Sequence, residues 1–493
     1  MHAGATEAPP RPAADRRAVV GSALVAVVAA VLLLAIEHGF SGAFPDDAFI
    51  GFRVARSIAD GDGWTYGAAV GHANPATSPL NTILLAVGYG VTHDMFLVAN
   101  VLFVVSAGIG AAAASLLAPG RRAYVTGLVT VGALLCCPLF LSTKGLESPL
   151  VVALVLSILA LHARDRDRLL GVVSGLALLC RPDLLAFVAA VLAWRRYERK
   201  PVLRTAAVTL AVWFPVQLGV GAAVGSFLPG SVSAKLAQGR SGLFGTNLFA
   251  TALPVRLRDL HSVGWIQFLI PLAVVGLVVG LRDGRWRRTA VPAVAGAALH
   301  YAVYAWILRP PGYHWYYTPE LLVLVLLVGI AATWVAEWSA RLVLAVVGVA
   351  LVLLPPGLAA PRGPAPADYV AVGEWLQQFT PSDASVASSE IGLIGWYSER
   401  PMVDFLGLLD SRSAEDVANG DLVGWLARDR PDYWVAEVPL TALERPAACS
   451  DAFAASYQQV PLPPSVSDVS NRHLVLFRRT DVPGPSLEQL GCP

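Results

Sequence analysis

Two adjacent carboxylates, Asp46 and Asp47, come directly after the first long apolar run of the chain. Acidic groups at a membrane boundary are costly to bury and are usually kept for function, and a carboxylate placed there can accept a proton. Residues 49–58 then combine an apolar side with a polar side that includes Arg53, as in an amphipathic helix lying on the membrane surface. A plainer interpretation, in which the two acids end one helix and cap the next, stays open.

Further polar side chains follow later apolar runs, and the predicted topology places them on the same outer face of the membrane. They are Lys144, Glu147, Arg181, Asp183, Lys235, Arg309, His314 and Glu320. Basic groups retained on that face would suit a phosphate linked to a lipid. The alternatives are that the arginines bind lipid head groups, that Arg181 and Asp183 form a structural ion pair, and that His314 belongs to an interfacial aromatic belt.

Composition indicates the class of protein. Of the 493 residues, 55% are hydrophobic and only 14% are charged. Soluble domains carry about 25% charged residues, so we predict an α-helical polytopic membrane protein. The chain contains no P-loop, no glycine-rich dinucleotide fingerprint and no cysteine or histidine spacing typical of zinc. Cytoplasmic nucleotide chemistry is therefore unsupported, and no nucleic-acid partner is expected.

Basic clusters determine the predicted topology. A basic, proline- and alanine-rich tail over residues 1–17 is expected to be disordered in the cytoplasm, so the first span, 19–36, ends outside. The apolar run 79–91 is short for a span. Treating it as an interfacial or re-entrant helix keeps the later basic clusters in the cytoplasm, whereas a crossing there would place them all outside.

The same charge rule makes residues 169–194 a helical hairpin with Arg-Pro-Asp at its outer turn. About eleven transmembrane helices result. They form a predicted membrane domain over residues 18–358, whose first outer loop covers 38–95.

The last part of the chain, 359–493, is predicted to be an α/β domain outside the membrane. About half of the acidic residues but only about a quarter of the basic ones lie there, which argues for a separate environment. Cys449 and Cys492 fall in this domain, and an oxidising outer side predicts a disulfide between them. The pattern predicts helices and strands over 369–379, 384–388, 401–405, 422–428, 433–437 and 474–478.

Several segments, taken in order, resemble one family of membrane enzymes. They are PDDAFIGFRVARSIADGDGWTYG, KGLESPL, LALLCRPDLLAF and SSEIGLIGWYSERPMVDFLGLLD, with FLPGSVSAK similar to a Leu-Pro-Asn-x(n)-Ala-Lys loop in which Gly230 replaces asparagine. The chain thus resembles polytopic glycosyltransferases of the C fold (GT-C), which use polyprenyl-phosphate sugars. The nearest group is the actinobacterial terminal β-(1→2)-arabinofuranosyltransferase family, whose donor is decaprenyl-phosphoryl-arabinofuranose. Relatives commonly carry Val-Glu-x-x-Thr-Ser where this chain has VGHANPATSPL, and the missing glutamate leaves the sugar and the acceptor open.

The resemblance implies an inverting transfer from a polyprenyl-phosphate sugar to a cell-envelope glycan or glycolipid, at the outer face of the plasma membrane. One of Asp46 and Asp47 would be the general base. Its neighbour would orient it, bind the acceptor or hold a metal; dependence on Mg²⁺ or Mn²⁺ varies among such enzymes and stays open. Substrate contacts, including those to the phosphate, are expected from Arg53, Lys144, Glu147, Arg181, Asp183, Lys235, Arg309 and His314.

Other functions compete with this interpretation. Mannose or another hexose is the alternative to arabinofuranose. A transporter or flippase for a lipid-linked sugar would place polar residues at the bilayer midplane and show repeated halves. A non-catalytic scaffold would need neither carboxylate. Because the polar residues gather at one face and no internal repeat is visible, the transferase is favoured.

Overall fold

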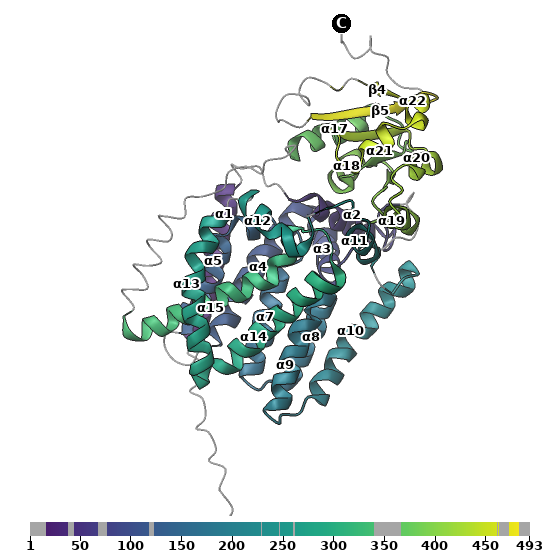
Figure 1. The fold of residues 1–493 in the computed structure, drawn as a ribbon. Coiled ribbons are helices and arrows are strands. Elements are labelled where there is room, and N and C mark those ends of the chain that lie inside the picture. The colour runs from purple at the N-terminus through teal and green to yellow at the C-terminus, as the bar shows by residue number, and fades with distance from the viewer. Residues whose placement is uncertain are drawn as a thin grey trace, which may run out of the picture.

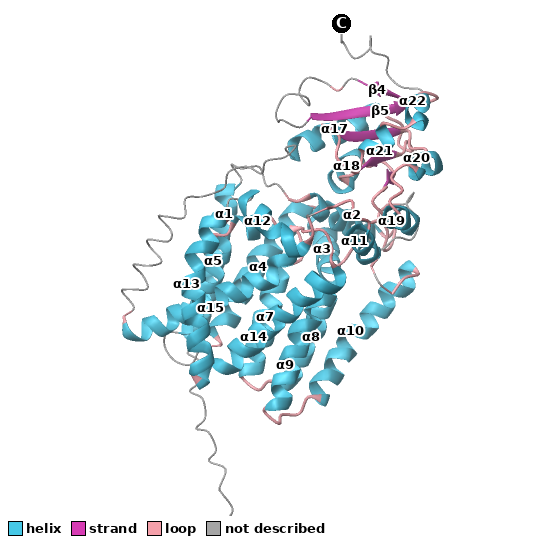
Figure 2. Ribbon diagram, in the orientation of Figure 1, coloured by secondary structure: helices cyan, strands magenta, loops and turns pink. Residues whose placement is uncertain are grey.

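The computed structural model describes residues 16–37, 44–67, 76–117, 123–227, 229–245, 247–259, 262–339, 366–460, 462 and 473–482. A bundle of helices forms the larger part, and a small sheet with its own helices sits at one end of the bundle (Figures 1 and 2). The chain is thus a mostly helical, polytopic membrane protein with a C-terminal α/β domain, as predicted. Residues 1–15 of the predicted N-terminal tail lie outside the described residues, and so does the predicted last span, 342–354.

Five of the described segments are long and apolar enough to cross a membrane. They are α4 (Met95–Ser115), α10 (Leu203–Val224), α13 (Val263–Arg282), α14 (Gly284–Ala302) continuing into the π-helical η3 (Val303–Leu308), and η4 (His314–Tyr317) continuing into α15 (Thr318–Trp338). The other helices of this part are α1 (Arg16–Glu37), α2 (Asp46–Asp60), α3 (Pro79–Thr92), α5 (Ala123–Leu135), α6 (Pro138–Leu141), α7 (Ser148–Ala163), α8 (Asp167–Cys180), η2 (Pro182–Leu184), α9 (Leu185–Tyr197), α11 (Gly230–Arg240) and α12 (Phe249–Asp259). The predicted number of crossings, about eleven, stays a prediction.

The Arg-Pro-Asp segment forms the turn of a helical hairpin, as predicted. Pro182 disfavours the helical conformation at the residue before it, and Arg181 accordingly has extended backbone angles (φ −152°, ψ 124°) that end α8. Arg195, near the end of α9, forms an ion pair with Asp167 at the start of α8. The two arms therefore run antiparallel, with Arg181 and Asp183 at their shared tip.

Helix α3 is short, as expected for the apolar run 79–91. Its 14 residues extend about 21 Å, whereas the hydrocarbon core of a bilayer is about 30 Å thick. Ser78 caps its start by accepting a hydrogen bond from the Asn81 backbone N–H (3.2 Å), and α3 packs beside α2. Whether α3 stays on one side of the membrane remains a prediction.

Helix α2 lies between the bundle and the C-terminal domain (Figure 1). Its Phe49 and Phe52 pack against Phe96 of α4, with ring centroids 6.1 and 6.2 Å apart, and against Trp396 of the C-terminal domain at 6.2 and 6.1 Å. The predicted amphipathic helix is present, but part of its polar side, including Arg53, is covered by protein. Sequence periodicity alone does not show which partner covers a polar face.

The C-terminal domain is built on a five-stranded mixed sheet. In spatial order the strands are β2 (Met402–Val403), β1 (Val386–Ser388), β3 (Tyr433–Val438), β5 (His473–Arg479) and β4 (Tyr457–Val460). Strand β1 pairs in parallel with β2 and β3, whereas β5 is antiparallel to β3 and β4. The helices are α17 (Pro366–Phe379), α18 (Ile391–Ser398), α19 (Ser411–Ala418), α20 (Gly424–Asp429), α21 (Arg445–Ala448) and α22 (Asp451–Ser456).

The predicted strands and helices of this domain are confirmed, whereas strand β4 and helices α18, α19, α21 and α22 were not predicted. Strand β4 has only four residues, with buried ends and two exposed glutamines between them, so it lacks the alternation typical of a strand. Cys449 is exposed on this domain, whereas Cys492 lies outside the described residues. The disulfide between them stays a prediction.

The orientation predicted for the C-terminal domain can be measured on α19. Glu415 is exposed there, so a cysteine introduced by Glu415→Cys should react with a membrane-impermeant maleimide in intact cells if the domain lies outside. The natural cysteines are first replaced by serine, and an introduced cysteine at Arg287, in the predicted cytoplasmic loop, serves as the matched control. Labelling of Glu415→Cys only after permeabilisation would reverse the predicted topology.

Candidate active site

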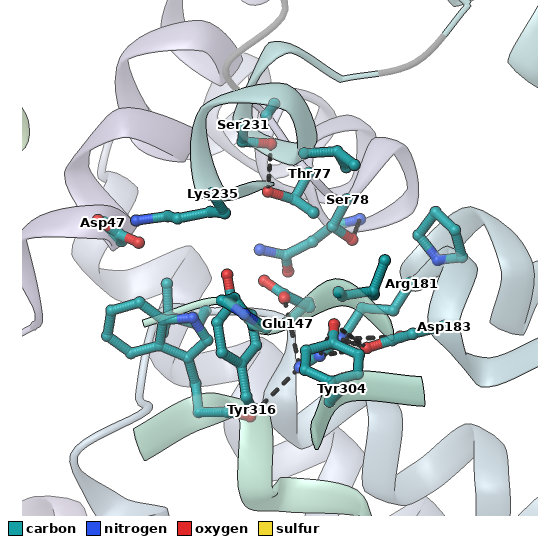
Figure 3. A pocket seen from close by; sticks show the side chains of 18 of the residues that line it. Asp47, Thr77, Ser78, Glu147, Arg181, Asp183, Ser231, Lys235, Tyr304 and Tyr316 are labelled. Carbon is teal, nitrogen blue, oxygen red and sulfur yellow. Dashed lines mark hydrogen bonds and ion pairs between the residues drawn. The ribbon is translucent and has the colours of Figure 1, made fainter. Parts of the chain in front are cut away.

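A cavity of about 510 Å³ lies where the bundle meets the C-terminal domain. Its walls come from α2, α3, the α8–α9 turn, α9, α11, the α14–η3 segment and η4, and Leu408 of the C-terminal domain also lines it. Figure 3 shows polar side chains from several of these elements converging on it. The polar or aromatic lining residues are Asp47, Thr77, Ser78, Asn81, Thr82, Glu147, Arg181, Asp183, Ser231, Lys235, His300, Tyr304, Trp315 and Tyr316.

The structure brings together half of the predicted site residues. Asp47, Glu147, Arg181, Asp183 and Lys235 all line the cavity, although they come from four separate segments of the sequence. Each was selected because its type is unusual at a membrane boundary, and each follows an apolar run. That signal therefore located a common site without information on packing.

Lys235 of α11 points toward Asp47 across the cavity (Figure 3). Its Nζ lies 3.9 Å from the centroid of the Tyr313 ring, which is a cation–π distance. Burial opposes the charge of Lys235, but Tyr313 and the Asp47 carboxylate outweigh it and raise the pKa of the ammonium above its ordinary value. A positive charge is thus held opposite a carboxylate at neutral pH.

The arrangement around Lys235 is fixed by contacts on both sides of α11. The hydroxyls of Ser231 and Thr77 are 2.9 Å apart and join α11 to the segment before α3. Gln238 Nε2 donates to the carbonyl of Leu406 in the C-terminal domain (3.4 Å). The helix that carries Lys235 is therefore tied both to the bundle and to the outer domain.

Asp46 faces the C-terminal domain instead of the cavity. Its carboxylate accepts hydrogen bonds from the backbone N–H groups of Gly392 (3.0 Å) and Leu393 (2.6 Å), at the start of α18. The start of a helix is a favourable place for a carboxylate. A Cβ on Gly392 would come within 2.0 Å of the Asp46 carbonyl oxygen, so only glycine permits this approach.

A second carboxyl group, that of Glu390, interacts with Asp46. Burial raises the pKa of Asp46 to about 7; Asp47 adds to this, and the two N–H donors on α18 act against it. Burial and the charge of Asp46 raise the pKa of Glu390 well above its ordinary value. The pair therefore retains a proton near neutral pH. Glu390 lies in the quoted SSEIG segment but was not singled out, because nothing in that segment shows that it meets α2.

Arg181 is held by groups from three elements. Its Nε lies 3.1 Å from both carboxylate oxygens of Asp183, and its Nη1 donates to the Trp315 carbonyl (3.2 Å). Glu147 lies 3.9 Å from Nη1. Burial opposes the charge of Asp183, but Arg181 outweighs it and holds the pKa of that carboxyl well below its usual range. The predicted structural ion pair exists, and both members also line the cavity.

Two residues of the α14–η3 segment, His300 and Tyr304, complete this end of the cavity and were missed in the sequence. Asp183 Oδ2 lies 2.6 Å from the Tyr304 hydroxyl and 3.1 Å from His300 Nε2. Glu320 of α15 lies 2.6 Å from His300 Nδ1. His300 and Tyr304 are four residues apart within an apolar run, so they share one helix face, and polar residues inside a span are a known sign of function.

Arg53 and Lys144 do not line the cavity. Arg53 donates to the backbone carbonyls of Gly395 (2.9 Å) and Arg400 (3.0 Å), so its guanidinium joins α2 to the C-terminal domain. Lys144 is buried, with Nζ 5.2 Å from the centroid of the Phe44 ring. Substrate contacts by these two residues stay predictions.

Arg309 and His314 are not among the lining residues, although their chain neighbours Leu308, Pro310 and Trp315 are. Arg309 is exposed and adopts a left-handed backbone conformation (φ 49°) just after η3. His314 Nε2 lies 3.3 Å from the Ser142 carbonyl oxygen. Their substrate contacts stay predictions as well.

The fit of a divalent cation was tested on the ligand groups. Among the described residues, no three histidine, cysteine, aspartate or glutamate side chains are placed to hold a metal ion. The Asp46 carboxylate lies against the backbone N–H groups at the start of α18, whereas Asp47 lines the cavity, so the two do not present a shared set of ligands. The pair Asp46 and Asp47 therefore does not fit a bound Mg²⁺ or Mn²⁺ in this arrangement.

Comparisons with known proteins support the fold. The family of a domain of unknown function, DUF8728, matches residues 362–477. A search of curated proteins finds no match. The crystal structure of ArnT from Cupriavidus metallidurans bound to undecaprenyl phosphate is similar over 95% of this chain and 99% of that one, with 14% identity and a TM-score of 0.56. The oligosaccharyltransferase of Archaeoglobus fulgidus is similar over 90% of this chain and 72% of that one, with 13% identity and a TM-score of 0.52.

These likenesses show that the chain has the GT-C fold, as the sequence motifs predicted. At such low identity they establish the architecture alone. The identity of the sugar, the acceptor and the roles of single residues do not follow from them.

The carboxyl pair of Asp46 and Glu390 should make stability depend on pH. The folded protein binds protons that an unfolded chain releases near pH 4. The free energy of unfolding should therefore fall as pH rises from about 4 to about 7. We expect a decrease on the order of 1–3 kcal/mol between pH 5 and pH 8, measured as thermal unfolding by tryptophan fluorescence.

Glu390→Gln should flatten this dependence, because it removes a carboxyl group whose own pKa is raised well above its ordinary value. Glu399→Gln is the matched control: Glu399 lies just after α18, is exposed and pairs with Arg56 at 3.2 Å. Exposed pairs contribute little to stability, so this variant should keep the wild-type slope. Equal slopes in all three proteins would contradict the assignment.

Proposed function

We propose that this protein is a membrane glycosyltransferase that moves a sugar from a polyprenyl-phosphate donor to a cell-envelope glycan or glycolipid on the outer face of the plasma membrane. The observation that carries the proposal is the cavity in which Lys235 points toward Asp47 and which Arg181 also lines. A transfer of this kind needs a base for the acceptor hydroxyl and positive charge for the departing phosphate. The likeness to ArnT, whose structure holds undecaprenyl phosphate, supports the donor class.

One side of the cavity suits a lipid. Leu185 of α9 and Leu299 of α14 line the cavity and are 57% and 44% exposed. In a membrane protein such exposed leucines face lipid. A donor would enter between these helices with its polyprenyl chain in the bilayer and its phosphate near Arg181 and Lys235.

In the proposed reaction, Asp47 is the general base, because it faces the cavity whereas both oxygens of Asp46 are used by α18. The acceptor hydroxyl gives its proton to Asp47 as its oxygen bonds to the anomeric carbon. The bond from that carbon to the phosphate oxygen breaks, and the polyprenyl phosphate leaves with the electron pair. Lys235 and Arg181 stabilise the charge that develops on it.

A single displacement of this kind inverts the anomeric carbon. Retention would need a carboxylate free to act as a nucleophile. The other cavity carboxylates, Glu147 and Asp183, are both engaged with Arg181. Arabinofuranose is the proposed sugar, on the strength of the resemblance in the outer-loop motifs, and a hexose such as mannose is the competing donor.

Purified protein incubated with a panel of polyprenyl-phosphate sugars should consume one of them, and we expect decaprenyl-phosphoryl-arabinofuranose to be consumed. Consumption of a mannosyl donor instead would correct the sugar and keep the reaction class. If no donor in the panel is consumed while envelope glycolipid acceptors are present, the transferase proposal is wrong.

Asp47→Asn should lose a factor of about 10²–10⁴ in turnover, because a positioned base contributes that much, and it should still bind the donor. Asp46→Asn should lose less turnover but lower the thermal unfolding midpoint, since it weakens the contact with α18. Single-turnover transfer and unfolding are measured on both variants. Near-normal transfer by Asp47→Asn in a folded protein would contradict its role as the base.

Lys235→Gln should raise the donor KM by roughly 10-fold to 100-fold, because it removes a charged partner of the phosphate. Arg309→Gln is the comparison variant, since Arg309 is a predicted phosphate contact that is exposed and is not among the residues lining the cavity. It should leave the donor KM close to that of the wild type. The opposite pattern, with only Arg309→Gln raising KM, would move the phosphate away from this cavity.

A further inference from the structure

His300 is buried in α14 with a carboxylate oxygen at each ring nitrogen. Glu320 Oε1 lies 2.6 Å from Nδ1, and Asp183 Oδ2 lies 3.1 Å from Nε2. Its side chain is 0% exposed. The Tyr304 ring stacks on the imidazole at 4.4 Å between centroids, and the Phe249 ring contacts it edge-on at 6.4 Å.

This geometry determines the charge of the imidazole. A neutral imidazole has one N–H and would point the lone pair of its other nitrogen at a carboxylate, whereas an imidazolium donates from both nitrogens. With both carboxyl groups ionised, only the imidazolium donates to Glu320 and Asp183 together. The chain Glu320–His300–Asp183–Arg181 therefore alternates negative and positive groups from α15 to the cavity wall.

With His300 charged, the two anions and two cations of this chain have no net charge. Arg181 faces Asp183 and, at 3.9 Å, Glu147. If His300 carried no charge, Glu320 would stand uncompensated behind Asp183, and the field at Arg181 would become more negative. The Oε2 atom of Glu320 is buried with no hydrogen-bond partner among the described residues, so no second donor replaces the imidazolium there.

We propose that His300 is a positioning residue for the phosphate site: its imidazolium holds Asp183, and so the Arg181 guanidinium, while cancelling the charge of Glu320. This inference rests on the proposed function, in which Arg181 stabilises the phosphate. His300 need not touch the reacting atoms for this role. Its charge acts through Asp183 on the affinity for an anion.

The test is a charge cycle built from His300→Gln, Glu320→Gln and the double variant. His300→Gln keeps a hydrogen-bond donor and loses the charge, so it should weaken binding of undecaprenyl phosphate and raise the donor KM by about 10-fold or more. Glu320→Gln alone should bind the phosphate as tightly as the wild type or several-fold more tightly. The double variant is neutral again and should recover most of the lost affinity.

Tyr304→Phe is the matched control, because it removes the hydroxyl that donates to the same Asp183 oxygen and accepts from Arg181, and it changes no charge. It should weaken phosphate binding only a few-fold. A loss as large as that of His300→Gln, or a double variant no better than His300→Gln, would reduce His300 to a packing role. If His300→Gln does not fold, weaker binding by Glu320→Gln would overturn the inference by itself.

Two readouts separate this inference from the proposed function. Undecaprenyl phosphate binding, followed by tryptophan fluorescence, needs no turnover. If the wild type binds the lipid and transfers no sugar, the transferase proposal fails and the charge cycle still decides the role of His300. If the wild type does not bind the lipid phosphate at all, both are wrong.

Discussion

The contact between the Asp46 carboxylate and the start of α18 is the interaction on which the cavity depends. Asp46 and Asp47 are the first two residues of α2, and consecutive residues of a helix point about 100° apart. Once Gly392 and Leu393 bind Asp46, the direction of Asp47 is fixed as well. Two chemically identical neighbours thus acquire different environments, one against backbone N–H donors and one in the cavity opposite Lys235.

The cavity combines an apolar lining with buried positive charge, and these two features usually exclude each other. Its apolar lining includes the exposed residues Leu185 and Leu299, whereas its polar lining holds buried cations. An isolated charge is costly in such a place. The cost is reduced by partners already within the protein: Asp183 and Glu147 for Arg181, and Tyr313 and Asp47 for Lys235. An anionic ligand would therefore meet cations that are preorganised and already partly neutralised.

Much of the fold and of the candidate site could be predicted from the sequence. The features that could not be predicted were missed for physical reasons. The hairpin turn, four of the five strands of the outer domain and the five cavity residues carry local signals, namely a proline after an arginine, an apolar pattern, or a charge beside an apolar run. Arg53 and Asp46 both form hydrogen bonds to the C-terminal domain, with residues more than 340 positions later in the sequence. The spacing of residues along the sequence does not encode such contacts. His300 and Tyr304 lie inside an apolar run, where hydropathy conceals single polar residues.

One lining residue makes the completion of the cavity depend on the order in which the chain is synthesised and folds. Leu408 belongs to the C-terminal domain, yet it lines part of the cavity whose other walls come from earlier segments of the chain. Ribosomes deliver the helices first, and domains generally fold in the order in which they are synthesised. The pocket is therefore incomplete until the last domain has been translated, has reached its side of the membrane and has folded onto α2. A partly translated chain in the membrane therefore lacks a complete cavity.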